Sequence, residues 1–513
     1  MGTRKRPQGA RWVSPPSLWT WAMAGLRRWW DTLKPPALHR PGGRPGAMDE
    51  RDHFFPLPGP QPMKSLLVLP LLLVSLSASA AMPEVDRYVQ EKMADHLVPG
   101  LALVVIREGK VVHRRGFGEL GTSDPIIIGS LSKAFTATAV MTLAEEGRIE
   151  LDAPMQRYLP ANTFDDPAMG RVTVRQLLNQ TSGLPAEAPR AEAHDASLAA
   201  HVAALQGVRL VSTPGTQHVY SSPNYQLLGR IVEVVSGESF ADYVQRRVLD
   251  PLQMTSSSTK GAGHVAPGHN LWWGWAGPST YRWEPGRLPT ASIVASADDL
   301  ARFVLWQLGD GPPILSDESR ALLQRGAGKS EYFSYAMGWR EGTTAGVPSL
   351  WHGGAVPSYR GAVVMLPQSR SGVIVLTNMS TMFADHTREI AAGVVASMEQ
   401  RPRPEGFRPL RQVYAVVAAG SLLLLGFAVR GLVRAVHKPG GRKWKIIGFD
   451  LLLPLAAILA APRLFHVSYR AMWEGAPDIT LTVALAVLLG VVAAVLNLVR
   501  GPDTGVGSQR NPG

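Results

Sequence analysis

The chain has 513 residues, of which 45% are hydrophobic, a formal net charge of +12 and no cysteine. The absence of cysteine excludes disulfides, thiolate catalysis and cysteine-based metal sites. The charge could indicate nucleic-acid binding, but it is concentrated in flanking segments. Residues 1–62 hold ten Lys and Arg against four acids, and residues 430–445 hold six bases and no acid. The segment between them is neutral, so we expect no nucleic-acid partner.

Residues 63–81 have the pattern of a secretory signal peptide: one lysine, an apolar run and small residues before a cleavage site. Sixty-two residues rich in Arg, Pro and Trp precede it, so the start could be Met1, Met48 or Met63. We favour a start at Met63. Alternatively, 1–62 is a disordered cytoplasmic extension and 65–81 an uncleaved anchor. Both alternatives put the following residues outside the cytoplasm.

Residues 82–408 have the pattern of one mixed α/β domain. Two β-rich runs flank the turn in 101–120, and 361–367 with 372–378 predict a second hairpin. Helical spacing occurs over 130–146, which ends at a glycine, and over 384–399.

Three apolar runs follow, near 413–429, 446–461 and 479–499, and they predict about three transmembrane helices within 412–500. The basic loop 430–445 is then cytoplasmic by the positive-inside rule. We expect a multi-pass protein of a bacterial cytoplasmic (inner) membrane, with the domain on the extracytoplasmic or periplasmic side and the bilayer as a partner. The tail 501–513 is predicted to be disordered.

The segment "IIGSLSKAFT" places Ser130 and Lys133 three residues apart where a helix is expected to begin. Residues i and i+3 share a helix face, so the lysine could accept the serine proton if burial lowers its pKa. The ordinary interpretation is a serine that caps a helix beside an exposed lysine. The same spacing recurs at Ser257 and Lys260 in a Ser/Gly-rich loop, where a solvated loop is the better interpretation.

Distant segments resemble the serine β-lactamase and penicillin-binding protein superfamily, specifically its class C β-lactamase-related branch. That branch includes D-alanyl-D-alanine carboxypeptidases and esterases. Its Ser-x-x-Lys, Tyr-x-Asn and Lys/His-x-Gly motifs are similar to the segments beginning at Ser130, Tyr220 and His352. Further similar segments are "VTVRQLLNQTSGLP" (172–185), "VLDPLQMTSSS" (248–258), "LPTASIVASADDLARF" (288–303) and "YAMGWR" (335–340).

The resemblance implies a β-lactamase/transpeptidase-like fold, with a central antiparallel sheet, flanking helices and a helical subdomain. It implies that Ser130 is the acylated nucleophile and that Lys133 and Tyr220 share proton transfer, with the phenol pKa lowered by the lysine. His352 stands beside the site. The bare strand edge at Gly353 and Gly354 would accept substrate backbone. The N–H groups of Ser130 and Ala355 would form the oxyanion hole.

Two positions depart from the family pattern. The usual asparagine of the second motif is Ser222, and Asn224 follows two residues later. We favour Ser222 at the asparagine site, with Asn224 as the alternative, and the change affects recognition of a substrate amide. The usual histidine of the "HTSGL" segment is Gln180, which has no evident role in the sequence.

The sequence therefore predicts a membrane-tethered serine hydrolase that forms an acyl-enzyme with a cell-wall D-peptide, a β-lactam or a small ester. The alternative is a catalytically silent module that binds cell-wall fragments. No cofactor or metal is expected, since the histidines at 218, 264 and 269 lack metal spacing and are interpreted as loop residues. For the tryptophans at 272, 273 and 275, packing is favoured over an acyl pocket. The oligomeric state is not predicted.

Overall fold

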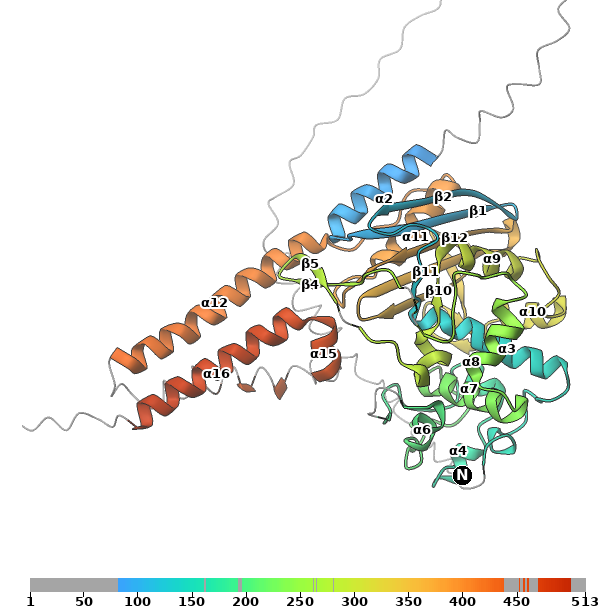
Figure 1. The fold of residues 1–513 in the computed structure, drawn as a ribbon, viewed down its shortest axis with the longest axis horizontal. Helices are drawn as coiled ribbons and strands as arrows, with labels where there is room; N and C mark the ends of the chain where they lie inside the picture. Colours follow the sequence, from blue (N-terminus) through green and yellow to red (C-terminus); the bar gives the residue numbers. More distant parts are fainter. Residues whose placement is uncertain are drawn as a thin grey trace, which may run out of the picture.

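The computed structural model describes residues 82–437, except 161–162, 192–195, 262, 264 and 280, together with 469–499 (Figure 1). Between them only 452, 455–456 and 459–460 are described. The predicted N-terminal extension, signal segment and C-terminal tail lie outside the described residues. So do His264 and most of the second predicted span.

The elements alternate between strands and helices along the chain. The strands are β1 (Gly100–Arg107), β2 (Lys110–Gly118), β3 (Ile126–Ile127), β4 (His269–Trp272), β5 (Trp275–Pro278), β6 (Val294–Ala295), β7 (Gly328–Lys329), β8 (Ser334–Tyr335), β9 (Arg340–Thr344), β10 (Val347–Val356), β11 (Tyr359–Leu366), β12 (Ser371–Thr377) and β13 (Met379–Ser380). The helices are α2 (Met82–His96), α3 (Ser132–Glu145), α4 (Pro167–Gly170), α5 (Val174–Leu178), α6 (Leu198–Ala203), α7 (Ser222–Ser236), α8 (Phe240–Val244), α9 (Ala297–Gln307), α10 (Asp317–Gln324), α11 (His386–Met398), α12 (Leu410–His437), α15 (Tyr469–Gly475) and α16 (Pro477–Val499).

An eight-stranded sheet in the order β2-β1-β12-β11-β10-β9-β8-β7 forms the centre of the domain, and its paired strands are antiparallel. Helices cover both faces of its central strands. Because both faces of β1 are buried, nearly every residue of β1 is apolar. In β1, Leu101, Leu103 and Val105 pack towards α2 and α11. The alternate residues Ala102, Val104 and Ile106 join the larger core that contains α3, α7 and α9.

Helices α4 to α8 form a helical region beside α3 (Figure 1). Helix α3 is buried along almost its whole length, as expected of a core helix with apolar residues on every side. Phe135 of α3 stacks on Phe303 of α9 with ring centroids 4.1 Å apart. The predicted antiparallel sheet, flanking helices and helical subdomain are therefore confirmed.

The local predictions match the structure with one adjustment. Both predicted hairpins form, as β1–β2 and β11–β12, and the 384–399 helix is α11. The helix expected from residue 130 begins later, because Gly129–Leu131 form a 3-10 turn, η1, and α3 starts at Ser132.

Two C-terminal helices, α12 and α16, are long and apolar enough to cross a membrane. The apolar run at 413–429 is short by itself, but α12 has 28 residues and spans about 42 Å at 1.5 Å per residue. Both helices begin beside the α/β domain. Tyr414 lies beside Gly274, where an added Cβ would be 3.5 Å from the Tyr414 Cβ, and Asp478 accepts the Trp273 N–H at 2.8 Å. They therefore run parallel and pack along each other (Figure 1). The count of three spans stays a prediction.

Candidate active site

Ser130 lies in the turn η1 immediately before α3, between the sheet and the helical region. Gly129 has φ of +57°, a conformation that favours glycine, and a Cβ there would lie 2.5 Å from the Ala355 backbone nitrogen. Gly354 is equally constrained, because its Cβ would lie 1.9 Å from the Ile128 carbonyl oxygen. Strand β10 and the Ser130 turn thus approach each other backbone to backbone. The backbone nitrogen of Ala355 therefore lies next to the residue that precedes Ser130.

Lys133 is the second residue of α3 and is fully buried. Its Nζ donates to Ser130 Oγ at 3.1 Å and to the Thr290 carbonyl oxygen at 2.9 Å. Burial lowers the pKa of Lys133, and the cations Arg287 and Arg340 lower it further, although interaction with Tyr220 acts in the opposite direction. A buried lysine with a depressed pKa can lose its proton and then accept one from the Ser130 hydroxyl.

Tyr220 precedes α7 and faces the same lysine. Lys133 Nζ lies 5.1 Å from the centroid of its ring, and Arg340 Cζ lies 5.3 Å from it. Burial alone would raise the pKa of Tyr220, but the charge of Lys133, the nearby Ser130 hydroxyl and the charge of Arg340 together lower it. The Tyr220 hydroxyl is buried without a hydrogen-bond partner among the described residues, so the charge of Lys133 acts on the phenol through space.

His352 lies on β10 behind Tyr220, with ring centroids 6.2 Å apart. Its Nδ1 lies 2.7 Å from the Gly353 carbonyl oxygen, so this nitrogen carries the proton and donates. Its Nε2 then accepts from the Tyr335 hydroxyl at 3.2 Å. Burial, followed by the charges of Arg340 and Lys133, holds the pKa of His352 well below its usual value. The neutral ring can orient neighbouring groups without adding a charge.

The edge of β10 next to the site has no partner strand among the described residues. Strand β9 pairs with β10 only at 347–351, whereas β11 continues along the other side to Val356. A Cβ on Gly353 would lie 3.8 Å from Asp385 Oδ2, so Gly353 faces α11, whereas Gly354 faces the Ser130 turn. An extended substrate could lie against this edge, as the Gly353-Gly354 pair predicts.

Ser222 and Asn224, the two candidates for the asparagine site of the second motif, differ in their exposure to solvent. Ser222 is exposed at the start of α7, two residues after Tyr220. Asn224 is buried, with its amide oxygen accepting from Ser182 Oγ at 2.6 Å and its amide nitrogen donating to Gln180 Oε1. Asn224 therefore holds the loop in place and is not available to a substrate, so the alternative that favoured Asn224 is not supported.

Gln180 and Arg340 were given no role by the sequence. Gln180 has a positive φ of 57° and accepts the Ser221 N–H at 2.9 Å as well as the Asn224 amide, so it positions the loop that carries Tyr220. Arg340 lies within 5.3 Å of the rings of Tyr220, Phe333 and Trp351. The terminal arginine of "YAMGWR" was the available signal, but only the fold brings it to Tyr220.

Two other histidines that the sequence singled out lie among the described residues. His218 stacks on Tyr335 and meets Phe333 edge-on, both with centroids 5.5 Å apart. His269 begins β4, so its interpretation as a loop residue is wrong. In the part of the chain that the structure describes, no group of three or more His, Asp or Glu side chains could hold a metal.

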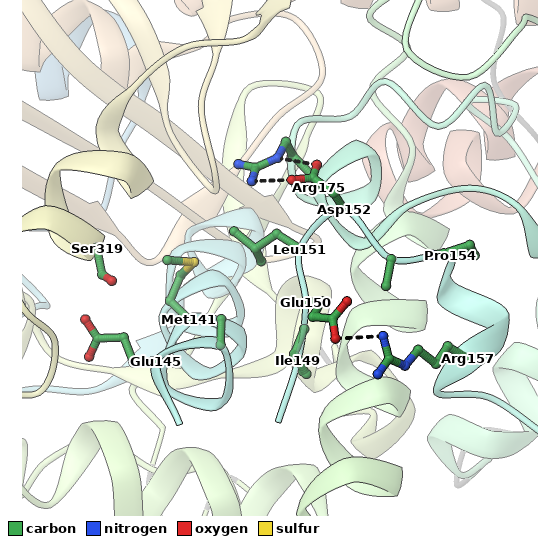
Figure 2. A pocket seen from close by; sticks show the side chains of 12 residues that line it. Met141, Glu145, Ile149, Glu150, Leu151, Asp152, Pro154, Arg157, Arg175 and Ser319 are labelled. Carbon is green, nitrogen blue, oxygen red and sulfur yellow. Dashed lines mark hydrogen bonds and ion pairs between the residues drawn. The ribbon is translucent and has the colours of Figure 1, made fainter. Parts of the chain in front are cut away.

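A separate pocket of about 650 Å³ lies at the far end of α3, away from Ser130 (Figure 2). Its charged residues mostly pair with one another: Arg175 binds Asp152 at 2.7 and 2.9 Å, and Arg157 binds Glu150 at 2.8 Å. None of the predicted site residues lines it, so we assign it no part in the chemistry.

The Beta-lactamase family profile matches residues 85–396 of this chain. The chain belongs to the Beta-lactamase family. This is a family of serine hydrolases that contains β-lactamases and penicillin-binding proteins, so the predicted resemblance is confirmed.

Penicillin-binding protein 4 of Amycolatopsis lactamdurans is 32% identical over 62% of this chain and 94% of its own length. Protein flp of Staphylococcus aureus (strain N315) is 27% identical over 58% of this chain, and the match spans 64% of that relative. The octameric penicillin-binding protein homologue from Pyrococcus abyssi superposes with a TM-score of 0.57 at 25% identity, covering 64% of this chain and 79% of the homologue. A β-lactamase/D-alanine carboxypeptidase from Pseudomonas syringae shares the fold, with a TM-score of 0.55 at 19% identity over 64% of this chain and all of its own.

Proposed function

We propose that this protein is a membrane-tethered, extracytoplasmic serine hydrolase that forms an acyl-enzyme on Ser130. The main support is the contact between the buried Lys133 amine and the Ser130 hydroxyl, 3.1 Å apart; among the residues that the structure describes, no carboxylate is a hydrogen-bond partner of Lys133. A carboxylate would stabilise the protonated lysine, whereas burial lowers the pKa of Lys133 and makes loss of its proton easier.

Acylation begins when the Lys133–Tyr220 pair takes the proton of Ser130 and Ser130 Oγ bonds to the substrate carbonyl carbon. The carbonyl electrons move to its oxygen, where the Ser130 and Ala355 N–H groups stabilise the negative charge. The intermediate then collapses, the bond to the leaving nitrogen or oxygen breaks, and the pair returns its proton to the leaving group. Water repeats the sequence on the acyl-enzyme and restores the Ser130 hydroxyl.

Arg340 favours substrates that carry a carboxylate. Its guanidinium lies against Tyr220, and its Nε has no hydrogen-bond partner among the described residues. A guanidinium fork matches a carboxylate with two parallel hydrogen bonds. Cell-wall D-peptides and β-lactams carry such a group near the reacting carbonyl, whereas simple esters do not. We therefore rank the D-peptide and β-lactam classes above small esters. Ser222, in place of the usual asparagine, leaves fewer contacts for a substrate amide.

The tether rests on α12 and α16. Because these helices run parallel from the domain, residues 438–468 connect the distal end of α12 to the domain-side end of α16. In a bilayer that connection must cross back, which supports three spans and a cytoplasmic 430–445 loop. On the domain side, Arg403 and Arg411 pair with Glu84 and Asp95, so these basic residues do not oppose an outer location. A reporter fused after Lys443 tests this: it should read as cytoplasmic, and an extracytoplasmic signal contradicts the topology.

Covalent labelling tests the chemistry. Full-length protein in detergent or vesicles is treated with a fluorescent penicillin and with a fluorescent fluorophosphonate, alongside Ser130→Ala. We expect labelling that the substitution abolishes. If folded wild-type protein reacts with neither probe, the silent binding module is the better description. Turnover of D-Ala-D-Ala peptides, nitrocefin and p-nitrophenyl esters then ranks the substrates.

A further inference from the structure

The β4–β5 hairpin extends from the hydrolase domain to the point where both apolar helices begin (Figure 1). At its tip, Trp273 and Gly274 have positive φ values and form the turn. The Trp273 N–H donates to Asp478, a buried carboxylate at the start of α16 that also accepts the Ile479 N–H at 2.9 Å. Gly274 lies against Tyr414 of α12. The hairpin is thus fixed to the ends of both helices.

Trp275 stands out on this hairpin because 75% of its surface is exposed. Its neighbour Trp272 packs against Gly277, so the expected packing role fits Trp272 but is wrong for Trp275. Within 82–400, few large apolar side chains are exposed among the described residues: Val112, Val211, Val234, Trp275, Tyr332 and Met382. Trp275 is the bulkiest of them.

Other exposed apolar side chains gather at the same level. Helix α15 precedes α16 and carries Tyr469 and Trp473, each 51% exposed. It packs on Met382, itself 40% exposed, because a Cβ on Gly475 would lie 3.7 Å from the Met382 Cβ. We call Trp275, Met382, Tyr469 and Trp473 the aromatic collar. The exposed apolar surface of α12 begins at Val416, within one turn of Tyr414.

We propose that the aromatic collar sits in the headgroup region of the bilayer and rests the hydrolase domain on the membrane surface. Tryptophan and tyrosine favour this region because an apolar ring there can be buried while its polar edge stays hydrated. Along the axis of α12, the collar lies at the level where the exposed apolar surface of the helix begins. A bilayer that surrounds α12 and α16 would therefore contact Trp275 with its headgroups. The inference rests on the proposed tether.

Position-specific labelling can test the collar, because the chain has no cysteine and each introduced cysteine is unique. Trp275→Cys, Tyr332→Cys and Leu488→Cys variants of the full-length protein carry an environment-sensitive fluorophore. They are reconstituted in phosphatidylethanolamine/phosphatidylglycerol vesicles containing nitroxide lipids labelled at the headgroup or near the chain end. Tyr332 is the matched control, an aromatic residue 80% exposed on the β7–β8 turn outside the collar. Leu488 lies midway along α16 and reports on insertion.

We expect the probe at 275 to be quenched several-fold more strongly by headgroup nitroxides than the probe at 332, and protected from aqueous iodide. The probe at 488 should be quenched best by chain-end nitroxides. If 488 is deep but 275 is open to iodide, the tether stands and the collar inference is overturned. Protection of 275 from both quenchers indicates a protein contact, such as a second copy, and also overturns it. Loss of deep quenching at 488 overturns the tether and the collar together.

Discussion

Two buried groups of charged side chains lie on opposite faces of the central sheet, and they are organised differently. The Glu389 cluster consists of Lys92, His96 and Glu389, between α2 and α11. Glu389 forms an ion pair with Lys92 Nζ at 2.7 Å and accepts hydrogen bonds from His96 Nε2 at 3.0 Å and from the Phe407 N–H at 3.0 Å. Burial would raise the pKa of Glu389, but these three donors lower it below its usual value.

The catalytic cluster consists of Lys133, Tyr220, Arg340 and His352, and no carboxylate is hydrogen-bonded to it among the described residues. Its lysine contacts only neutral oxygens, and its histidine is held neutral. We call a cluster compensated when opposite charges are paired in it, as around Glu389, and uncompensated when they are not. Pairing stabilises one protonation state of each group, whereas in an uncompensated cluster a buried group changes its protonation state at a smaller free-energy cost. The Glu389 cluster therefore joins α2, α11 and the segment that leads to α12, and the catalytic cluster fits the proposed proton transfer and the proposed anionic ligand.

The largest effect should follow removal of the catalytic amine. Lys133→Ala should lower kcat/KM by about 10²–10⁴, the usual range for loss of a general base, while the thermal unfolding temperature changes little. Lys260→Ala is the matched control, since Lys260 has the same spacing from Ser257 but pairs with Asp242 at 2.7 Å on the surface. Retention of more than a tenth of wild-type activity by Lys133→Ala, a difference of about 1.4 kcal/mol, contradicts the assigned role.

At the Glu389 cluster we expect a loss of stability with no loss of activity. Glu389→Gln should lower the free energy of unfolding by roughly 3 kcal/mol, the lower end of the range for a broken buried pair, because Lys92 is partly exposed. Acylation of Ser130 should be unchanged. Because the folded-state pKa of Glu389 is depressed, its contribution is complete above the unfolded value near 4.5 and is lost as pH falls through the folded value. Denaturant unfolding at neutral and acid pH measures both effects, and a pH-independent difference between the variants contradicts the linkage.

Substitution of Arg340 tests whether its unpaired charge binds the carboxylate of a substrate. Arg340→Ala should reduce kcat/KM for a D-Ala-D-Ala peptide with a free carboxylate by about 10- to 100-fold, equivalent to about 1.5–3 kcal/mol for a charged hydrogen bond. The same peptide with a C-terminal amide should be affected much less. Arg340→Lys retains the charge without the fork and should be intermediate, and Arg157→Ala at the distant pocket (Figure 2) should have no effect. Equal losses on both peptides contradict carboxylate recognition.

The smallest effect concerns pH. Since the pKa values of Lys133 and Tyr220 are both lowered, kcat/KM should rise with pH through an inflection below the free lysine value of 10.5. His352 is already neutral across this range because its pKa lies well below 6.5. His352→Gln should therefore lower the plateau without moving the inflection at neutral and alkaline pH. A shift that follows the histidine substitution instead assigns the titration to His352.

The sequence predicted features that depend on neighbours in the chain. Ser130 and Lys133 are three residues apart, and the β1–β2 and β11–β12 hairpins are set by their turns, so short-range pattern was enough. Arg340 and Gln180 were missed because their roles come from contacts with Tyr220 and Asn224 across long separations. The choice between Ser222 and Asn224 depended on which face of the first turn of α7 is buried, and spacing alone does not give that face.

The close approach of Gly129 and Gly354 has a consequence for the order in which activity appears during synthesis. The proposed nucleophile and base are neighbours near the beginning of the domain, but Ala355, the second proposed oxyanion donor, is made more than 200 residues later. A nascent chain that has reached α9 already carries Ser130 and Lys133 and still lacks the strand that stabilises the transition state. With the proposed site, activity would need β10 to be made and to join the sheet, so catalytic competence would come only near completion of the domain.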